Sequence, residues 1–288
     1  MHDAPFGGRR AILLLMFLEP LIFGGFGLIV GSFLNVLVLR EGTGRTIQGR
    51  SACMSCGHTL SWLDLIPVVS WAALRGRCRF CGSRVSVQYP LVELTTAVLF
   101  AAIGAFPLIS IAFKVLFCVS VALLVAIAAY DILHTIIPDM WVYSFDALAI
   151  ISTLLLLSHD SYDPVWLILL SGPIVALPLY TLWFVSGGKW MGLGDAKLAL
   201  GIGWLLGPVN GSIAIAGSFV IGAVISVFIL IPISNAGLIK SYLGITSLKS
   251  VDRRLTMTSE VPFGPFLIAS CIIIWFLNAY GFSIPLFG

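Results

Sequence analysis

The chain is organised around one short stretch, Trp190-Met191-Gly192-Leu193-Gly194-Asp195-Ala196-Lys197-Leu198. It places the carboxylate of Asp195 directly after two closely spaced glycines and directly before an apolar helical run. Glycine lets the backbone turn tightly and approach another segment closely. A carboxylate at membrane depth is costly, and by default it marks a functional site. The second such carboxylate is Asp131, which ends the apolar run that begins at Leu123. These two aspartates are therefore the candidates for a catalytic pair.

The composition places the chain in a membrane. Of its 288 residues, 59% are hydrophobic and 10% are charged, and the mean hydropathy is +1.06. No soluble domain has that balance, and the long apolar runs exclude a barrel, whose strands alternate. We therefore predict an all-α polytopic membrane protein. Its first apolar run, 11–39, is too long for a signal-peptide core, so a retained helix is expected there.

The apolar runs predict about eight transmembrane helices. Their approximate bounds are 11–39, 91–106, 107–131, 140–157, 164–185, 196–206, 209–231 and 261–286. The run 196–206 is too short to cross a bilayer as a straight helix. If it counts as a span, 13 lysines and arginines lie on one side of the membrane and three lie on the other. That imbalance places Asp131 and Asp195 together on the cytoplasmic side. The alternative, seven spans, would move the basic loop 232–262 to the outside.

Three segments follow from this pattern: the first transmembrane helix (1–39), a polar cytoplasmic loop (40–88) and a helical core (89–288). The loop contains Cys53-Met54-Ser55-Cys56-Gly57 and Cys78-Arg79-Phe80-Cys81-Gly82. Two CxxC pairs at this separation match the spacing of a four-cysteine zinc site. The glycine after each pair lets the turn fold back, so that backbone N–H groups face the sulfurs.

Two disulfides are the alternative use of the four cysteines, and they would require an oxidising compartment. The loop holds seven arginines against two acids, which favours the reducing cytoplasm. We therefore predict a structural zinc ion held by the thiolates of Cys53, Cys56, Cys78 and Cys81. Arg77 and Arg79 are expected to offset the negative charge of those thiolates.

Two carboxylates at one membrane–water boundary, without a His or Ser partner, indicate acid–base activation of a water molecule. Like charges so close cannot both ionise, so the pair would share one proton. The alternative is that Asp195 only caps its helix and Asp131 only ends its own. Helix dipoles favour an ionised Asp195 at a helix start and a protonated Asp131 at a helix end. Asp195 is therefore expected to be the base.

Two other polar positions have structural interpretations. Asn35 shares a helix face with Ser32, which favours hydrogen bonding between helices, with direct catalysis as the alternative. Glu93 lies near the start of its helix, where the dipole favours an acid, and a contact with substrate is the alternative.

These motifs together resemble those of the type IV prepilin peptidase family. The stretch 192–198 is similar to the family's GxGD signature, and Asp131 with Ile137-Pro138-Asp139 is similar to its first aspartate motif. Residues 31–36 and 262–266 resemble its first and last signatures. The two CxxC pairs sit where the bifunctional members carry theirs. GxGD alone also occurs in presenilin-like proteases, so the cysteine pairs and the terminal signatures make the resemblance specific.

The resemblance implies a bifunctional leader peptidase and N-methyltransferase in the bacterial cytoplasmic (inner) membrane. Such enzymes cut the leader from type IV prepilins or type II secretion pseudopilins at the cytoplasmic face. They then methylate the new N-terminal residue with S-adenosylmethionine. By matching positions, Asp131 and Asp195 would be catalytic, the cysteines would hold the metal, and Gly192, Gly194 and Lys197 would form a supporting loop. No residue is assigned to S-adenosylmethionine. The expected partners are the precursor protein and membrane lipid, with no nucleic acid and an unknown oligomeric state.

Two other functions fit the same residues. A polytopic protein with intramembrane acids could be a proton-coupled transporter, although transporter sites usually sit near the bilayer midplane. A GxGD protease acting on other membrane helices is the second alternative.

Overall fold

A computed structural model describes residues 6–43, 49–106, 110–160, 165–230 and 261–281 of the chain. Every regular element within these ranges is a helix, and no β-strand forms there. The predicted all-α class is therefore confirmed for the described part. Most of the basic loop 232–262, including Lys240, Lys249, Arg253 and Arg254, lies outside the described residues.

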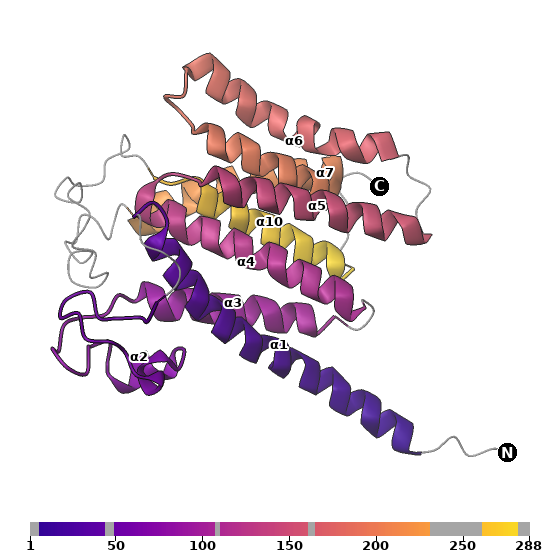
Figure 1. Cartoon of the computed structure of the whole chain (residues 1–288). Helices are drawn as coiled ribbons and strands as arrows, with labels where there is room; N and C mark the ends of the chain where they lie inside the picture. Colours follow the sequence, from indigo (N-terminus) through magenta and orange to yellow (C-terminus); the bar gives the residue numbers. More distant parts are fainter. Residues whose placement is uncertain (1–5, 44–48, 107–109, 161–164, 231–260, 282–288) are drawn as a thin grey trace. The chain divides into compact units, whose positions relative to one another are not determined.

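The described residues form two compact units, divided between Ala126 and Ile127. Figure 1 labels their helices. Helix α4 (Ile111–His134) contributes to both. The other elements of the first unit are α1 (Phe6–Arg40), the 3-10 helix η1 (Trp62–Leu65), α2 (Val69–Ala73) and α3 (Gln88–Gly104). Those of the second are α5 (Asp139–Asp160), α6 (Val165–Ser186), α7 (Leu193–Ile225), the π-helix η2 (Ser226–Leu230) and α10 (Gly264–Ala279).

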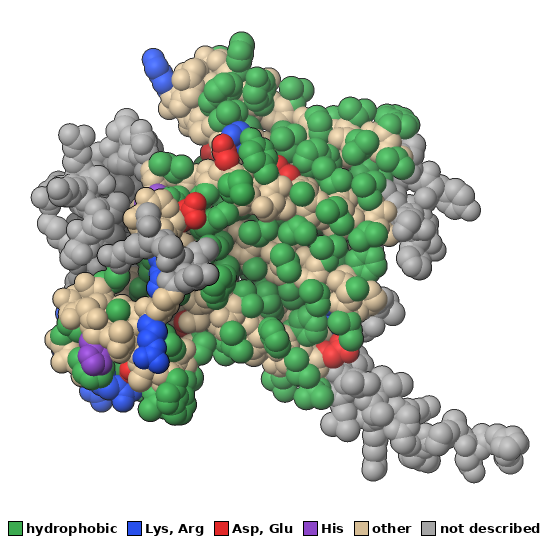
Figure 2. Space-filling model, in the orientation of Figure 1, with side chains coloured by type: hydrophobic (Ala, Val, Ile, Leu, Met, Phe, Trp, Pro, Cys, Tyr) green, Lys and Arg blue, Asp and Glu red, His purple; other side chains and the backbone are tan. Residues whose placement is uncertain are grey.

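Four described stretches are long and apolar enough to cross a membrane: Leu18–Arg40, Ile111–His134, Val165–Ser186 and Leu193–Phe228. Helices α3 and α10 are shorter apolar helices. Figure 2 shows that apolar side chains cover most of the helical surface in view, with few charges among them. A surface of this kind suits lipid rather than water.

Helices α1 and α3 of the first unit pack closely because glycines of α1 face α3. A Cβ atom at Gly27 would lie 2.6 Å from the Cα of Ala97, and one at Gly31 would lie 2.7 Å from the Cα of Glu93. Small residues allow this approach between membrane helices. The Nδ2 of Asn35 donates to the carbonyl of Tyr89 at 3.1 Å. The predicted role of Asn35 in bonding between helices is therefore confirmed.

Helix α7 carries a break at Gly207, as predicted, where φ is 78° and ψ is 176°. The next residue, Pro208, has no N–H, so the carbonyl of Trp204 loses its helical partner. The hydroxyl of Thr153 donates to that carbonyl at 2.8 Å. Ser171 likewise donates to the carbonyl of Gly203 at 2.8 Å. Hydroxyls from α5 and α6 therefore satisfy the backbone groups that the break releases.

Candidate active site and metal centre

Asp195 is a buried residue in the first turn of α7. The N-cap of this helix is Gly192, so the alternative that Asp195 is the N-cap is wrong. Its carboxylate instead turns back to the backbone of Gly192, as an acid at the third helical position does in a capping box. The helix start therefore orients the Asp195 side chain and favours its negative charge.

Gly194 is a glycine because the link between α4 and α5 passes close to it. A Cβ atom at this position would lie 2.9 Å from the Cβ of Ile137. Lys197, the third residue of the predicted supporting loop, turns elsewhere. Its ammonium pairs with Asp139 at 2.7 Å and lies 5.3 Å from the ring centroid of Tyr143. The Lys197 side chain therefore ties α7 to the start of α5.

Asp131 is buried on α4, and that helix continues to His134. The predicted helix end at Asp131 is therefore wrong by about one turn. The Oδ2 atom of Asp131 accepts a hydrogen bond of 3.1 Å from the backbone N–H of Gly264, the first residue of α10. A Cβ atom at Gly264 would lie only 2.6 Å from Oδ2. This part of α10 therefore accepts no larger residue without moving the carboxylate.

The second unit brings the two aspartates together. The charge of Asp131 acts on the carboxyl group of Asp195. The side chain of Ile137 lies next to Gly194, in the first turn of α7, and also next to Gly264, the first residue of α10. Three stretches that the sequence analysis singled out, 131–139, 190–198 and 262–266, therefore converge on one site.

The different roles predicted for the two aspartates depended on Asp131 lying at the end of its helix, and this position is wrong. Asp131 does not end its helix, and the N-terminus of α10 points at its carboxylate through Gly264. Both carboxylates are thus placed at the positive end of a helix, one at α7 and the other at α10. Helix dipoles consequently do not decide which of the two holds the shared proton.

Asp146 on α5 is a further buried carboxylate, with 6% of its surface exposed, and the sequence analysis did not single it out. The Asp146 carboxylate lies against the backbone of Gly201 on α7, so a larger residue at position 201 would displace it. The signal that could have found it is an acid inside an apolar helix, two turns after Asp139.

The four predicted metal ligands form a compact cluster of free thiols in the first unit. The Sγ atoms of Cys53, Cys56, Cys78 and Cys81 all lie within 4.8 Å of one another. Those of Cys53 and Cys81 are 3.8 Å apart. A tetrahedral zinc site with metal–sulfur distances of about 2.3 Å has sulfur–sulfur edges of about 3.8 Å. The cluster therefore fits a zinc ion in ligand type, number and size.

The two CxxC turns fold in the same way. The N–H of Gly57 donates to the carbonyl of Cys53 at 2.8 Å, and that of Gly82 donates to the carbonyl of Cys78 at 3.0 Å. Both glycines have φ near 70°, which a residue with a side chain rarely adopts. The predicted folding back of each turn at its glycine is confirmed.

Backbone N–H groups of Cys56 and Ser55 lower the pKa of the Cys53 thiol to about 6. The hydroxyl and backbone N–H of Ser83 likewise lower the pKa of Cys81. Both effects favour the thiolate, which is the form that binds a metal. Despite a hydrogen bond from the backbone of His58, desolvation and the neighbouring Cys53 and Cys81 raise the pKa of Cys56 to about 11. The fold therefore favours negatively charged sulfur at Cys53 and Cys81 in particular.

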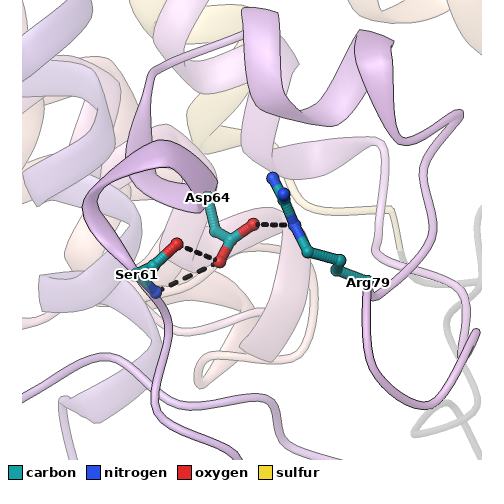
Figure 3. Close-up of polar contacts among 3 residues, drawn as sticks. All are labelled: Ser61, Asp64 and Arg79. Carbon is teal, nitrogen blue, oxygen red and sulfur yellow. Dashed lines mark hydrogen bonds and ion pairs between the residues drawn. The ribbon is translucent and has the colours of Figure 1, made fainter.

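Arg79 was expected to offset the charge of the thiolates, but it is engaged by Asp64. Its Nε lies 2.8 Å from Oδ1 of Asp64 (Figure 3). The other carboxylate oxygen accepts hydrogen bonds from the hydroxyl of Ser61 at 2.6 Å and from its N–H at 3.1 Å. These bonds, with Ser61 first, lower the pKa of Asp64. Arg79 therefore fastens η1 to the second CxxC turn.

Glu93 has a different role from the predicted one. It is buried in the second turn of α3, and its Oε2 accepts a hydrogen bond of 2.7 Å from the backbone N–H of Val68. The side chain of Ser32 on α1 also bonds to it. Glu93 thus ties the polar loop to two helices instead of responding to the dipole of α3.

Comparison with known proteins agrees with this arrangement. Residues 26–106 match the model of the bacterial peptidase A24 N-terminal domain, and residues 118–227 match that of the type IV leader peptidase family. The first match contains the four clustered cysteines and the second contains Asp131 and Asp195. No solved structure matches the chain.

Several curated relatives share one printed name, prepilin leader peptidase/N-methyltransferase. The relative from Pseudomonas putida is 31% identical over 91% of this chain and 92% of its own length. The one from Bacillus subtilis is 34% identical over 69% of this chain and 78% of its own length. The one from Myxococcus xanthus is 48% identical over 114 residues, and that match spans only 33% of its length. The chain therefore belongs to the type IV leader peptidase family.

Proposed function

We propose that this protein is a bifunctional prepilin leader peptidase and N-methyltransferase of the bacterial cytoplasmic membrane. The observation that carries the proposal is the convergence of Asp131 and Asp195, two buried carboxylates that interact and that are each placed at a helix N-terminus. The names of the relatives support the same activities.

In the peptidase reaction, Asp131 and Asp195 act as one acid–base unit that holds a single shared proton. The ionised carboxylate accepts a proton from water as the water oxygen adds to the scissile carbonyl carbon. The protonated carboxyl donates to the carbonyl oxygen, and a proton then moves to the departing amine as the C–N bond breaks. Gly264 holds Asp131 in place through its N–H, and the start of α7 holds Asp195.

The membrane arrangement that supports this chemistry has eight spans. The helical segments are α1, α3, α4, α5, α6, the two halves of α7 on either side of Gly207, and α10. The excess of lysine and arginine on one side of this arrangement favours a cytoplasmic location for the cysteine loop and for both aspartates. A water molecule and the leader of a precursor can reach the pair from that side.

The four thiolates would hold zinc as a structural ion that joins the two CxxC turns. S-adenosylmethionine would supply the methyl group for the second reaction, and its binding residues are not assigned. The substrate class is the precursor of a type IV pilin or a type II secretion pseudopilin, and membrane lipid surrounds the helices.

Reconstituted full-length protein tests the proposal directly. A prepilin should lose its leader, and the new N-terminus should gain one methyl group when S-adenosylmethionine is present, as read by mass spectrometry. The Asp131→Asn variant is the control for cleavage. Proton flux without cleavage would favour the transporter alternative. Cleavage of unrelated membrane helices but not of prepilin would favour the other class of GxGD protease.

A further inference from the structure

The cysteine-bearing loop exposes a group of apolar side chains that peptidase chemistry does not explain. We name it the apolar ridge, and it consists of Trp62, Leu63, Leu65, Ile66 and Val69. Trp62 is 74% exposed, Val69 is 60% exposed, and the other three are at least 36% exposed. Figure 2 shows apolar side chains next to basic ones in the region where Figure 1 places α2. Large apolar side chains that are exposed next to one another mark an interaction surface.

The ridge is a rigid surface rather than a loose loop. Asp64, in the middle of it, turns inward and keeps only 4% of its side chain exposed. It is held by Ser61 and by Arg79 (Figure 3). Because Asp64 is fixed on the inner side, the neighbouring residues Leu63 and Leu65 are presented outward.

The hydrogen bond between Glu93 and Val68 fixes the depth of the ridge. Val68 lies between Ile66 and Val69, and its N–H binds a carboxylate on α3. The 17 residues of α3 span about 26 Å, which is less than the roughly 30 Å of the hydrocarbon core. In the proposed arrangement a helix of this length starts close to the boundary of the hydrocarbon core, and Glu93 lies about 8 Å along it. The hydrogen bond therefore holds the backbone at Val68 beside the first turns of α3, at this end of the bilayer.

The charge around the ridge suits the same partner. Arg75 and Arg77 are exposed in this module, and the side chain of Arg79 is 47% exposed. Basic residues at a membrane surface attract anionic lipid headgroups, and tryptophan is enriched at the same level.

We propose that the apolar ridge inserts into the headgroup region of a bilayer that contains anionic lipid, and that it docks the cysteine module on the membrane surface. The inference rests on the proposed crossing of the membrane by α1 and α3. It is independent of the peptidase activity. The exposed apolar segment of a precursor protein is the competing occupant, and the test below separates the two.

The experiment uses the full-length protein in nanodiscs, with a nitroxide attached to a genetically encoded keto amino acid that replaces Trp62. This chemistry leaves all six cysteines untouched. The matched control carries the label at Met54, which is 73% exposed on the first CxxC turn. The measured quantity is the accessibility of each label to oxygen, which concentrates in lipid, relative to a water-soluble nickel chelate. Metal content confirms that both labelled modules are folded.

In discs that contain phosphatidylglycerol, we expect the oxygen-to-nickel ratio at position 62 to be at least several-fold higher than at position 54. The difference should shrink in discs made only of phosphatidylcholine and in the Arg75→Gln variant. An equal or lower ratio at position 62 would overturn the proposal. So would protection from nickel that occurs only after prepilin is added, because the ridge would then bind peptide. Prepilin cleavage is assayed in the same discs, so failure of docking and failure of the peptidase function are distinguished.

Discussion

The backbone N–H of Gly264 donates a 3.1 Å hydrogen bond to Oδ2 of Asp131, across 133 residues of sequence. Gly264 opens α10, so this bond places the Asp131 carboxylate at the positive end of that helix. Asp195 lies in the first turn of α7 itself, so its carboxylate is also at the positive end of a helix. Both carboxylates therefore lie at helix N-termini, which reduces the cost of holding a negative charge in an apolar interior.

Substituting Gly264 by alanine should disable the peptidase. The added Cβ would lie 2.6 Å from Oδ2 of Asp131, so the carboxylate must move. A displacement of the carboxylate by roughly 1 Å costs about 10²-fold in rate, because the reacting groups are no longer aligned. Single-turnover cleavage of a prepilin measures the loss. The matched control is Gly25→Ala in α1, where nothing lies within 4 Å of the new Cβ, and full activity is expected there.

The two aspartates should behave as one unit in a mutant cycle. Asp131→Asn and Asp195→Asn should each lower the cleavage rate by about 10³-fold or more, and the double variant should be no slower than either single one. Methylation of a peptide that has already been cleaved checks that each variant is folded. Substantial cleavage by either single variant, or strictly additive losses, would remove the shared-proton mechanism.

Metal retention and thiol reactivity in the loop should depend on pH in a defined direction. The Cys53 thiol has its pKa lowered to about 6, so its thiolate persists at neutral pH and is protonated as the pH falls through that value. In metal-free protein, alkylation of Cys53 should therefore rise with a midpoint near pH 6, as read by peptide mass spectrometry. Zinc should block this reaction at neutral pH, and it should be released as the pH falls further. A midpoint at the ordinary thiol pKa of about 8.5 would show that the backbone N–H groups do not stabilise the Cys53 thiolate.

The ion pair between Lys197 and Asp139 should contribute little to stability. The nitrogen and oxygen are 2.7 Å apart, but 59% of the Asp139 side chain is exposed, so water screens the charges. A double-mutant cycle with Lys197→Met and Asp139→Asn should give a coupling free energy of about 0.2–1 kcal/mol in thermal unfolding, and less at high salt. A coupling well above 2 kcal/mol would show that this pair is not an ordinary exposed one.

Glu93 should control the local stability of the loop at Val68. The backbone there has φ 60° and ψ −47°, which is strained for a branched residue. Removing the acceptor in Glu93→Ala should cost about 1–3 kcal/mol locally, because the Val68 N–H is left without its hydrogen-bond partner. Hydrogen exchange in peptides covering 66–72 should then be roughly ten- to hundred-fold faster. Glu93→Gln retains an acceptor oxygen and should show a smaller increase. Unchanged exchange in both variants would exclude the clamp.

Local chemistry made several features readable from the sequence. Two CxxC pairs, each followed by glycine, specify their own turns, and the structure confirms both turns and the close approach of the four thiols. The glycine–proline pair at 207–208 breaks α7 as predicted, whereas the pair at 172–173 lies inside the uninterrupted helix α6. Asp131 and Asp195 stood out because few acids occur in apolar runs. The number of spans is a less local property, and eight remains a prediction.

Only the tertiary structure decided which distant groups meet. No pattern along the chain shows that the N–H of Gly264 binds Asp131, that Glu93 holds Val68, or that Asp64 takes Arg79. The helix dipole at Asp131 was misjudged for the same reason, since the relevant helix is α10 rather than α4. A side chain's partners depend on which segments the fold brings within about 3 Å, and hydrogen bonds at that range carry no periodic signal in the sequence.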